Sequence, residues 1–293
     1  MSLLSMAPSL LLGAELGAEA SEKQPSVADA VFEHVTDSHV LEFHWPFGGQ
    51  LVIQLPHWPV SLFGHVYDFG PTKHVVWMWI ASVVLFLVVF LAGRARGKSL
   101  VPKGLSNLIE MIVLFVRDEI ALKTMDEQMA DQYLPYLLTA FFFIVFSAGV
   151  GLFPFSATSV GNIAVTAALA GCTFVLMQVA GISHQGFFGY FKHLIPAGVP
   201  WWMTPLMFPI ELLGLFTKTF ALCIRLFANM IAGHIVIFFI LGLVFIMHTP
   251  IVAIGSVPFA VALYLLELII ILIQAYIFTM LSALFIGMSA HAH

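Results

Sequence analysis

Two charged side chains lie in the long apolar C-terminal part of the chain, far from any polar segment. Between Thr219 and the C-terminus at His293 the formally charged residues are Arg225 and Glu267, set within runs of Leu, Ile, Phe, Val and Met. An arginine at the centre of a membrane helix costs about 2.5 to 3.5 kcal/mol on insertion scales. Its guanidinium cannot lower this cost by losing its proton. We therefore expect Arg225 to have a function that offsets the cost.

Further polar residues share one stripe with this arginine. Asn229 follows Arg225 by four residues, Lys218 precedes it by seven, and Glu211 precedes it by fourteen. At 100° per residue these four positions fall within about 40° of one another around a helix. The sequence predicts a polar face on an otherwise apolar helix.

A second polar face is predicted on the last apolar run. Glu267 and Gln274 are seven residues, and therefore about 20°, apart on a helix. His234 lies on the preceding run, on roughly the opposite face from Arg225. If the two runs pair as antiparallel helices around a turn at residues 248 to 250, His234 is about 15 residues before the turn and Glu267 about 17 after it. We expect this base and this acid, which can hold and relay protons, to meet.

The same counting predicts the surroundings of the arginine. Arg225 and Gln274 are each about 24 residues from the turn, so we expect them to lie level, with Asn229 one turn outward. Glu267 would lie far from Arg225, which leaves the arginine without an acidic partner at its own depth. Its partner would then belong to another subunit or be a passing anion.

Other interpretations stay open at this point. A buried histidine such as His234 often serves in packing, membrane amides often join helices, and an Arg with a Glu can form a structural ion pair. A secondary transporter could bind an anionic substrate through Arg225, but it would normally show an internal repeat, and none is evident. A haem- or metal-binding subunit would need a second ligand at the depth of His234, and only Glu267 offers one.

The composition indicates an all-α integral membrane protein. The chain has 293 residues, of which 60% are hydrophobic and 9% charged, and its mean hydropathy is +1.00. A typical soluble domain has about a quarter of its residues charged. The two cysteines, Cys172 and Cys223, lie in apolar runs, so we expect small packing residues rather than a disulfide framework or a thiolate metal site.

About five membrane helices are predicted within a membrane domain at residues 73–293. A helix needs about 20 apolar residues to cross the bilayer, and the last two apolar runs are about 40 residues long. They must tilt or lie partly along the membrane plane, as a hairpin at about 203–290. The predicted spans are His74 to Ala92, Tyr133 to Phe153, Ile163 to Gly181, Pro205 to His248 and Ile251 to Met288.

Charges around the first span predict its orientation. Basic residues follow it closely and place this loop in the cytoplasm by the positive-inside rule: Arg94, Arg96, Lys98 and Lys103. The N-terminus is then outside and the C-terminus cytoplasmic. Residues 104–125 carry a stripe of apolar side chains, which predicts an amphipathic helix on the inner surface. A second short amphipathic piece lies in the cytoplasmic connection from Ile182 to Trp202, where Lys192 suits that side.

Residues 1–72 are expected outside the membrane. This acidic, His-rich segment contains several prolines, which predicts a short helix around 26 to 40 and then an extended part. The first 20 residues could be a signal peptide, although they lack the usual basic start; the alternative is a weakly ordered or amphipathic segment.

The C-terminal motifs resemble subunit a of the F-type ATP synthase. The segment PIELLGLFTKTFALCIRLFANMIAGHI (209–235) is similar to that family's hallmark helix, and LELIIILIQAYIFTMLSALFIGM (266–288) to its final helix. VPKGLSNLIEMIV and TSVGNIAVTAALA also match, so the resemblance covers roughly residues 72–293. Thr219 stands where the family usually has proline, and Ala148 and Gly151 stand where asparagine or aspartate is often found.

The resemblance implies a role and partners. Subunit a is the membrane stator beside a rotating c-ring, is joined to the subunit b peripheral stalk, and provides two offset proton half-channels. ATP chemistry takes place elsewhere in the complex, so this chain is not expected to be an enzyme. No cofactor, metal or nucleic acid is implied. Protons are the expected ion because nothing here forms an obvious sodium cage. The lack of an Arg- and Ser-rich transit segment favours a bacterial plasma (inner) membrane.

The resemblance also implies roles for individual residues. Arg225 would face a c-ring carboxylate, favour its ionised form and block a direct leak between the half-channels. The other six residues fall into pairs: Asn229 and Gln274 to orient the charged groups, His234 and Glu267 in the outer half-channel, and Glu211 and Lys218 near the opening of the inner one.

Overall fold

The computed structural model describes most of the chain between residues 36 and 290. The described ranges are 36–45, 49–62, 65–68, 70–96, 104–153, 156–193, 202–247 and 249–290. The signal-like segment and most of the helix expected over residues 26 to 40 lie outside them. Residues 36–39 are not helical and Val40 begins a strand, so the helix prediction is wrong at its C-terminal end. The backbone there pairs with other segments instead: the carbonyl of Ser38 accepts from Lys73 N, and that of His39 from Leu55 N.

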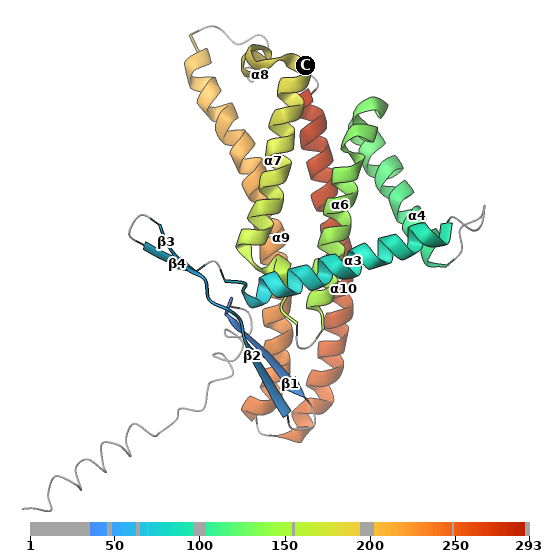
Figure 1. Cartoon of the computed structure of the whole chain (residues 1–293), viewed down its shortest axis with the longest axis vertical. Coiled ribbons are helices and arrows are strands. Elements are labelled where there is room, and N and C mark those ends of the chain that lie inside the picture. The colour runs from blue at the N-terminus through green and yellow to red at the C-terminus, as the bar shows by residue number, and fades with distance from the viewer. Residues whose placement is uncertain are drawn as a thin grey trace, which may run out of the picture.

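The extended part predicted before the first span consists of two small hairpins. Strand β1 (Val40–Trp45) pairs antiparallel with β2 (Gly49–Gln54), and β3 (Pro59–Leu62) pairs antiparallel with β4 (His65–Asp68). In Figure 1 the hairpins lie to one side of the helices, near the start of the first membrane helix. The extended character of this segment is confirmed.

Five helices are long and apolar enough to cross a membrane, as the sequence predicts. Two short helical elements join them: the 3₁₀ turn η2 (Ser159–Gly161) and the seven-residue helix α8 (Phe187–His193). The chain is thus a multi-pass membrane protein. The five long helices are α3 (Lys73–Arg96), α6 (Glu127–Gly151), α7 (Ile163–Gln185), α9 (Thr204–Met247) and α10 (Pro250–Ala290).

Helix α10 lies at the centre of the bundle. It packs against α6, α7 and α9, while α3 packs against α6. Figure 1 shows α9 and α10 as an antiparallel hairpin along the whole molecule, with α3 running across the bundle. Fully buried apolar side chains fill the contacts between these helices, among them Leu137, Ile144, Leu226, Ile271 and Phe278. This core fixes the register of α9 against α10.

The amphipathic segment expected over residues 104–125 is three consecutive elements. These are α4 (Leu105–Phe115), the π-helix η1 (Val116–Ala121) and α5 (Leu122–Thr124). The predicted apolar stripe is divided between two environments: Leu105 and Leu108 are exposed, whereas Val116 and Ile120 are fully buried. The second half of the segment packs against α6 and α10 and so belongs to the core.

Candidate functional site

The predicted pairing of His234 with Glu267 is confirmed. His234 of α9 has its Nδ1 atom 2.7 Å from Oε1 of Glu267 on α10. Both residues are buried, with 8% and 4% of their surface exposed. Gly233 permits this approach, because a Cβ atom there would lie 2.9 Å from the same carboxylate oxygen. A histidine beside a buried carboxylate can take up and release protons.

The ring of His234 also contacts two backbone carbonyls. Its Nε2 lies 3.1 Å from the oxygen of Gly151, and its Nδ1 lies 3.1 Å from that of Met230. Both ring nitrogens therefore face acceptors, and both donate only when the imidazole carries two protons. Gly151 takes part in this contact through its backbone carbonyl. Apart from the 2.7 Å contact with His234 Nδ1, the oxygens of Glu267 have no hydrogen-bond partner within the described part of the chain.

The predicted register of α9 against α10 is wrong by about one helical turn near Arg225. Asn229 Nδ2 donates to Gln274 Oε1 at 2.8 Å, so Gln274 lies beside Asn229 rather than level with Arg225. The prediction counted residues equally from the turn. Helical side chains lean toward the N-terminus of their own helix, so on an antiparallel pair they lean in opposite directions. A residue of α9 therefore meets a residue of α10 that lies farther from the turn.

The surroundings of Arg225 agree with the expectation that it lacks an acidic partner. It is half-buried and makes no hydrogen bond or ion pair with any residue that the structure describes. It lines a groove of about 540 Å³ between α9 and α10, together with Lys218 and Phe285. Lys218 holds its ammonium 5.9 Å from the centre of the Phe285 ring, a cation–π contact. The groove thus brings together two cations.

Sequence analysis also singled out Glu211 and Thr219 on α9. Glu211 is half-buried on α9 but does not line the groove, so the structure does not bring it to Arg225. At Thr219, where the resemblance predicts proline, the helix is continuous and the hydroxyl donates to the Leu215 carbonyl. The threonine therefore leaves the backbone ladder of α9 intact near Lys218.

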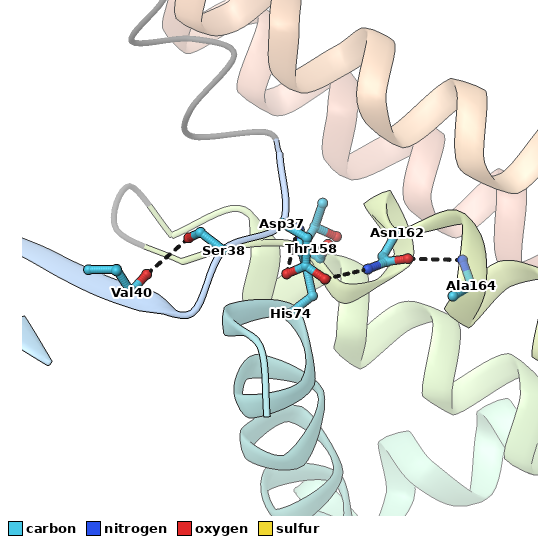
Figure 2. A network of polar contacts seen from close by, with 7 residues as sticks. All are labelled: Asp37, Ser38, Val40, His74, Thr158, Asn162 and Ala164. Atoms are coloured by element: carbon cyan, nitrogen blue, oxygen red, sulfur yellow. Dashed lines mark hydrogen bonds and ion pairs between the residues drawn. The ribbon is translucent and has the colours of Figure 1, made fainter. Parts of the chain in front are cut away.

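Sequence analysis missed a polar cluster at the start of α3 (Figure 2). We call it the outer cluster, after the side of the membrane on which the sequence predicts it: Asp37, His74, Thr158 and Asn162. It joins the segment before β1 to the start of α3, to η2 and to the start of α7. A small cavity lined by His74 and Thr158 is also lined by His234. A histidine at the outer end of a span, after an acidic segment, was the available sequence signal.

Three helices are also joined by side-chain hydroxyls. The Tyr136 hydroxyl of α6 lies 2.6 Å from Thr173 Oγ1 of α7, which lies 3.1 Å from Ser282 Oγ of α10. Such contacts hold membrane helices in register. Among the described residues, no three His, Cys, Asp or Glu side chains are grouped so as to hold a metal ion.

Comparison with known proteins gives consistent matches. The family model of the ATP synthase A chain matches residues 75–287. ATP synthase subunit a of Myxococcus xanthus is 56% identical over 223 residues, which cover 76% of this chain and 73% of that protein. The subunit a of Anaeromyxobacter dehalogenans strain 2CP-C is 52% identical over 271 residues, 89% of this chain and 70% of that protein. The subunit a of Chloroherpeton thalassium is 46% identical over 268 residues, 90% and 77% of the two chains.

Proposed function

The chain belongs to the ATP synthase A chain family, and we propose that within the ATP synthase complex it conducts protons between the two sides of the membrane and a rotating c-ring. It is a membrane component of that complex, in keeping with a non-catalytic role. In this proposal the ATP chemistry takes place on the soluble head, and the chain needs no cofactor. The observation that carries the proposal is the cation of Arg225, which lines the open groove between α9 and α10 and has no ion-pair partner among the residues that the structure describes.

A carboxylate on the c-ring is the partner that this cation fits best. A fixed positive charge in a low-dielectric wall favours the ionised form of a carboxyl group that comes to face it. A protonated c-ring site that reaches Arg225 would release its proton, and the charge would also keep protons from passing straight between two half-channels. Gln274 adds a buried amide nitrogen with no hydrogen-bond partner in the described part, which suits orienting the carboxylate together with Asn229.

The outer half-channel of this proposal includes His234 and Glu267. A proton from outside would reach this pair and pass along the α9–α10 contact to the c-ring. The inner half-channel would open near Lys218 and Glu211, at the other end of the groove from the histidine. The driving force is about 2.3 kcal/mol per elementary charge for each 100 mV of membrane potential.

The orientation follows from the basic loop after α3. With Arg94 and its neighbours in the cytoplasm, residues 1–72 lie outside a bacterial inner membrane and the C-terminus lies inside. Subunit b of the peripheral stalk would hold the chain still while the c-ring turns. Protons are the proposed ion.

Substitution of Arg225 tests this function. In reconstituted complexes Arg225→Ala should abolish ATP-driven proton pumping, while the soluble head still hydrolyses ATP. Arg94→Ala removes an exposed arginine at the end of α3 and is the matched control, which should pump normally. Undiminished acidification by the Arg225→Ala complex would contradict the proposal.

A further inference from the structure

The carboxylate of Asp37 is held at the outer surface of the bundle, in contact with water. Its side chain is 35% exposed. Asn162 Nδ2 donates to its Oδ2 at 3.0 Å, and the other side-chain oxygen of Asn162 accepts from Ala164 N at 2.9 Å, which caps α7. One carboxylate oxygen is therefore fixed by α7, and the other faces His74 (Figure 2).

His74 connects this surface carboxylate to the interior. Its side chain is 4% exposed. Nδ1 lies 3.0 Å from the backbone carbonyl of Thr158, which can only accept, so Nδ1 carries the hydrogen. Nε2 then has a lone pair in the neutral ring, and it lies 4.0 Å from Asp37 Oδ1. That separation suits one bridging water or a direct ion pair once the ring is protonated.

A cavity lies between His74 and His234, the histidine paired with Glu267. Both residues line it, together with Ser156 and Thr158. Its volume of about 10 Å³ is close to what one water molecule needs. The hydroxyl of Thr158 is buried and has no hydrogen-bond partner within the described residues, so a water there would find a polar partner.

We propose that Asp37 and His74 form the outer entrance of the proton path, upstream of His234 and Glu267. Asp37 takes a proton from water and passes it to Nε2 of His74. The imidazolium releases its Nδ1 proton through the cavity to His234, so that one proton enters the ring and one leaves it. Rotation of the ring then restores the starting tautomer without returning the proton. This inference rests on the proposed function, because it supplies protons to the same path.

The alternative is that these residues only clamp the external segment onto the membrane domain. The backbone carbonyl of Ser38 accepts from Lys73 N at 2.9 Å, and Ser38 Oγ donates to the Val40 carbonyl at 3.2 Å. A clamp depends on shape and hydrogen bonds, whereas a relay depends on groups that titrate. The two roles can therefore be separated by substitutions that keep the shape and remove the proton site.

The test measures passive proton flux through the whole membrane sector, with the soluble head removed, in proteoliposomes. Asp37→Asn keeps the shape and the acceptor for Asn162, and His74→Ala removes the ring. Both should lower flux from the outer side about tenfold, less than the hundredfold or more typical of an essential proton-transfer group, because water can replace part of the path. Asp37→Glu, which still titrates, should conduct nearly normally, as should the matched control Ser38→Ala, which loses one hydrogen bond and no proton site.

Rescue distinguishes the relay from the clamp. Imidazole added on the outer side should restore flux through His74→Ala and leave the wild type unchanged, with vesicles that contain no protein giving the background leak. Normal flux in Asp37→Asn and His74→Ala would overturn the relay, as would an equal loss in Ser38→Ala or a failure of imidazole to restore flux. If Arg225→Ala abolishes ATP-driven pumping in complexes that keep the soluble head, such a result counts against the relay alone; if it does not, the proposed function itself fails.

Discussion

Two stretches of α9, nine residues apart, present polar side chains in opposite ways. At the first, which we call the outer pair, His234 of α9 and Glu267 of α10 are buried against each other beside a cavity of about 10 Å³. At the second, Arg225 lines an open groove of about 540 Å³ and has no ion-pair partner in the described part. The acid and base of the outer pair both come from this chain, whereas Arg225 has no such partner among the described residues. In the proposed function, the pair carries a proton inside the subunit, and Arg225 is where the proton meets the c-ring.

Among substitutions that compare these two stretches, those of His234 and Glu267 should lower proton pumping the most. Glu267→Gln and His234→Ala should each lower ATP-driven proton pumping about a hundredfold or more, as for loss of a positioned proton-transfer group. Exchanging the two residues, His234→Glu with Glu267→His, should restore more pumping than either half of the exchange alone. Normal pumping by the single variants would show that the pair only holds α9 and α10 together and transfers no protons.

A smaller loss of pumping is expected from substitution of Gly233, which allows Glu267 to approach α9 closely. Gly233→Val would place side-chain atoms where Glu267 now lies, so α9 and α10 must separate. Overpacking of this kind costs about 1 to 3 kcal/mol, and the melting temperature of the purified complex and its pumping should both fall. Gly255→Ala is the control: nothing lies within 4 Å of an added Cβ there, so stability should hold or rise slightly. Equal effects at the two glycines would contradict the close approach.

The smallest effect on stability is expected for the hydrogen bond between the side-chain amides of Asn229 and Gln274. Asn229→Leu and Gln274→Leu should show a coupling energy of about 0.6 kcal/mol in a double-mutant cycle, typical of an interhelical hydrogen bond in membranes. If these amides also orient charged groups at the groove, pumping should fall well beyond what this loss of stability explains. Pumping that falls only in proportion to stability would leave the pair as interhelical glue.

The pattern of hydrophobic residues was sufficient to predict the membrane helices and their hairpin. The five spans and the long final hairpin follow from runs of apolar residues, and the contact of His234 with Glu267 follows from counting around a turn. The finer register did not follow, because the count left out the lean of side chains that brings Gln274 to Asn229. Local side-chain direction thus decides contacts that residue spacing alone misplaces.

The contacts within the outer cluster could not be predicted from the sequence for a different reason. Asn162 contacts Asp37 across 125 positions, and His74 bonds to the backbone carbonyl of Thr158 across 84. A backbone carbonyl is present at every position and leaves no mark in the sequence. The π-helix at Val116–Ala121 was missed similarly, since its apolar residues also fit an ordinary amphipathic helix.

The central claim is that the groove of Arg225 faces another subunit, and cysteine cross-linking tests it most directly. The native Cys172 and Cys223 are first replaced by alanine, and a cysteine is then placed beside the c-ring carboxylate. A second cysteine is placed either at Ala221, which lines the groove, or at Val175, on the exposed surface of α7. We predict that oxidation joins Ala221→Cys to the c-ring and leaves Val175→Cys free. A cross-link from Val175→Cys with none from Ala221→Cys would contradict the account.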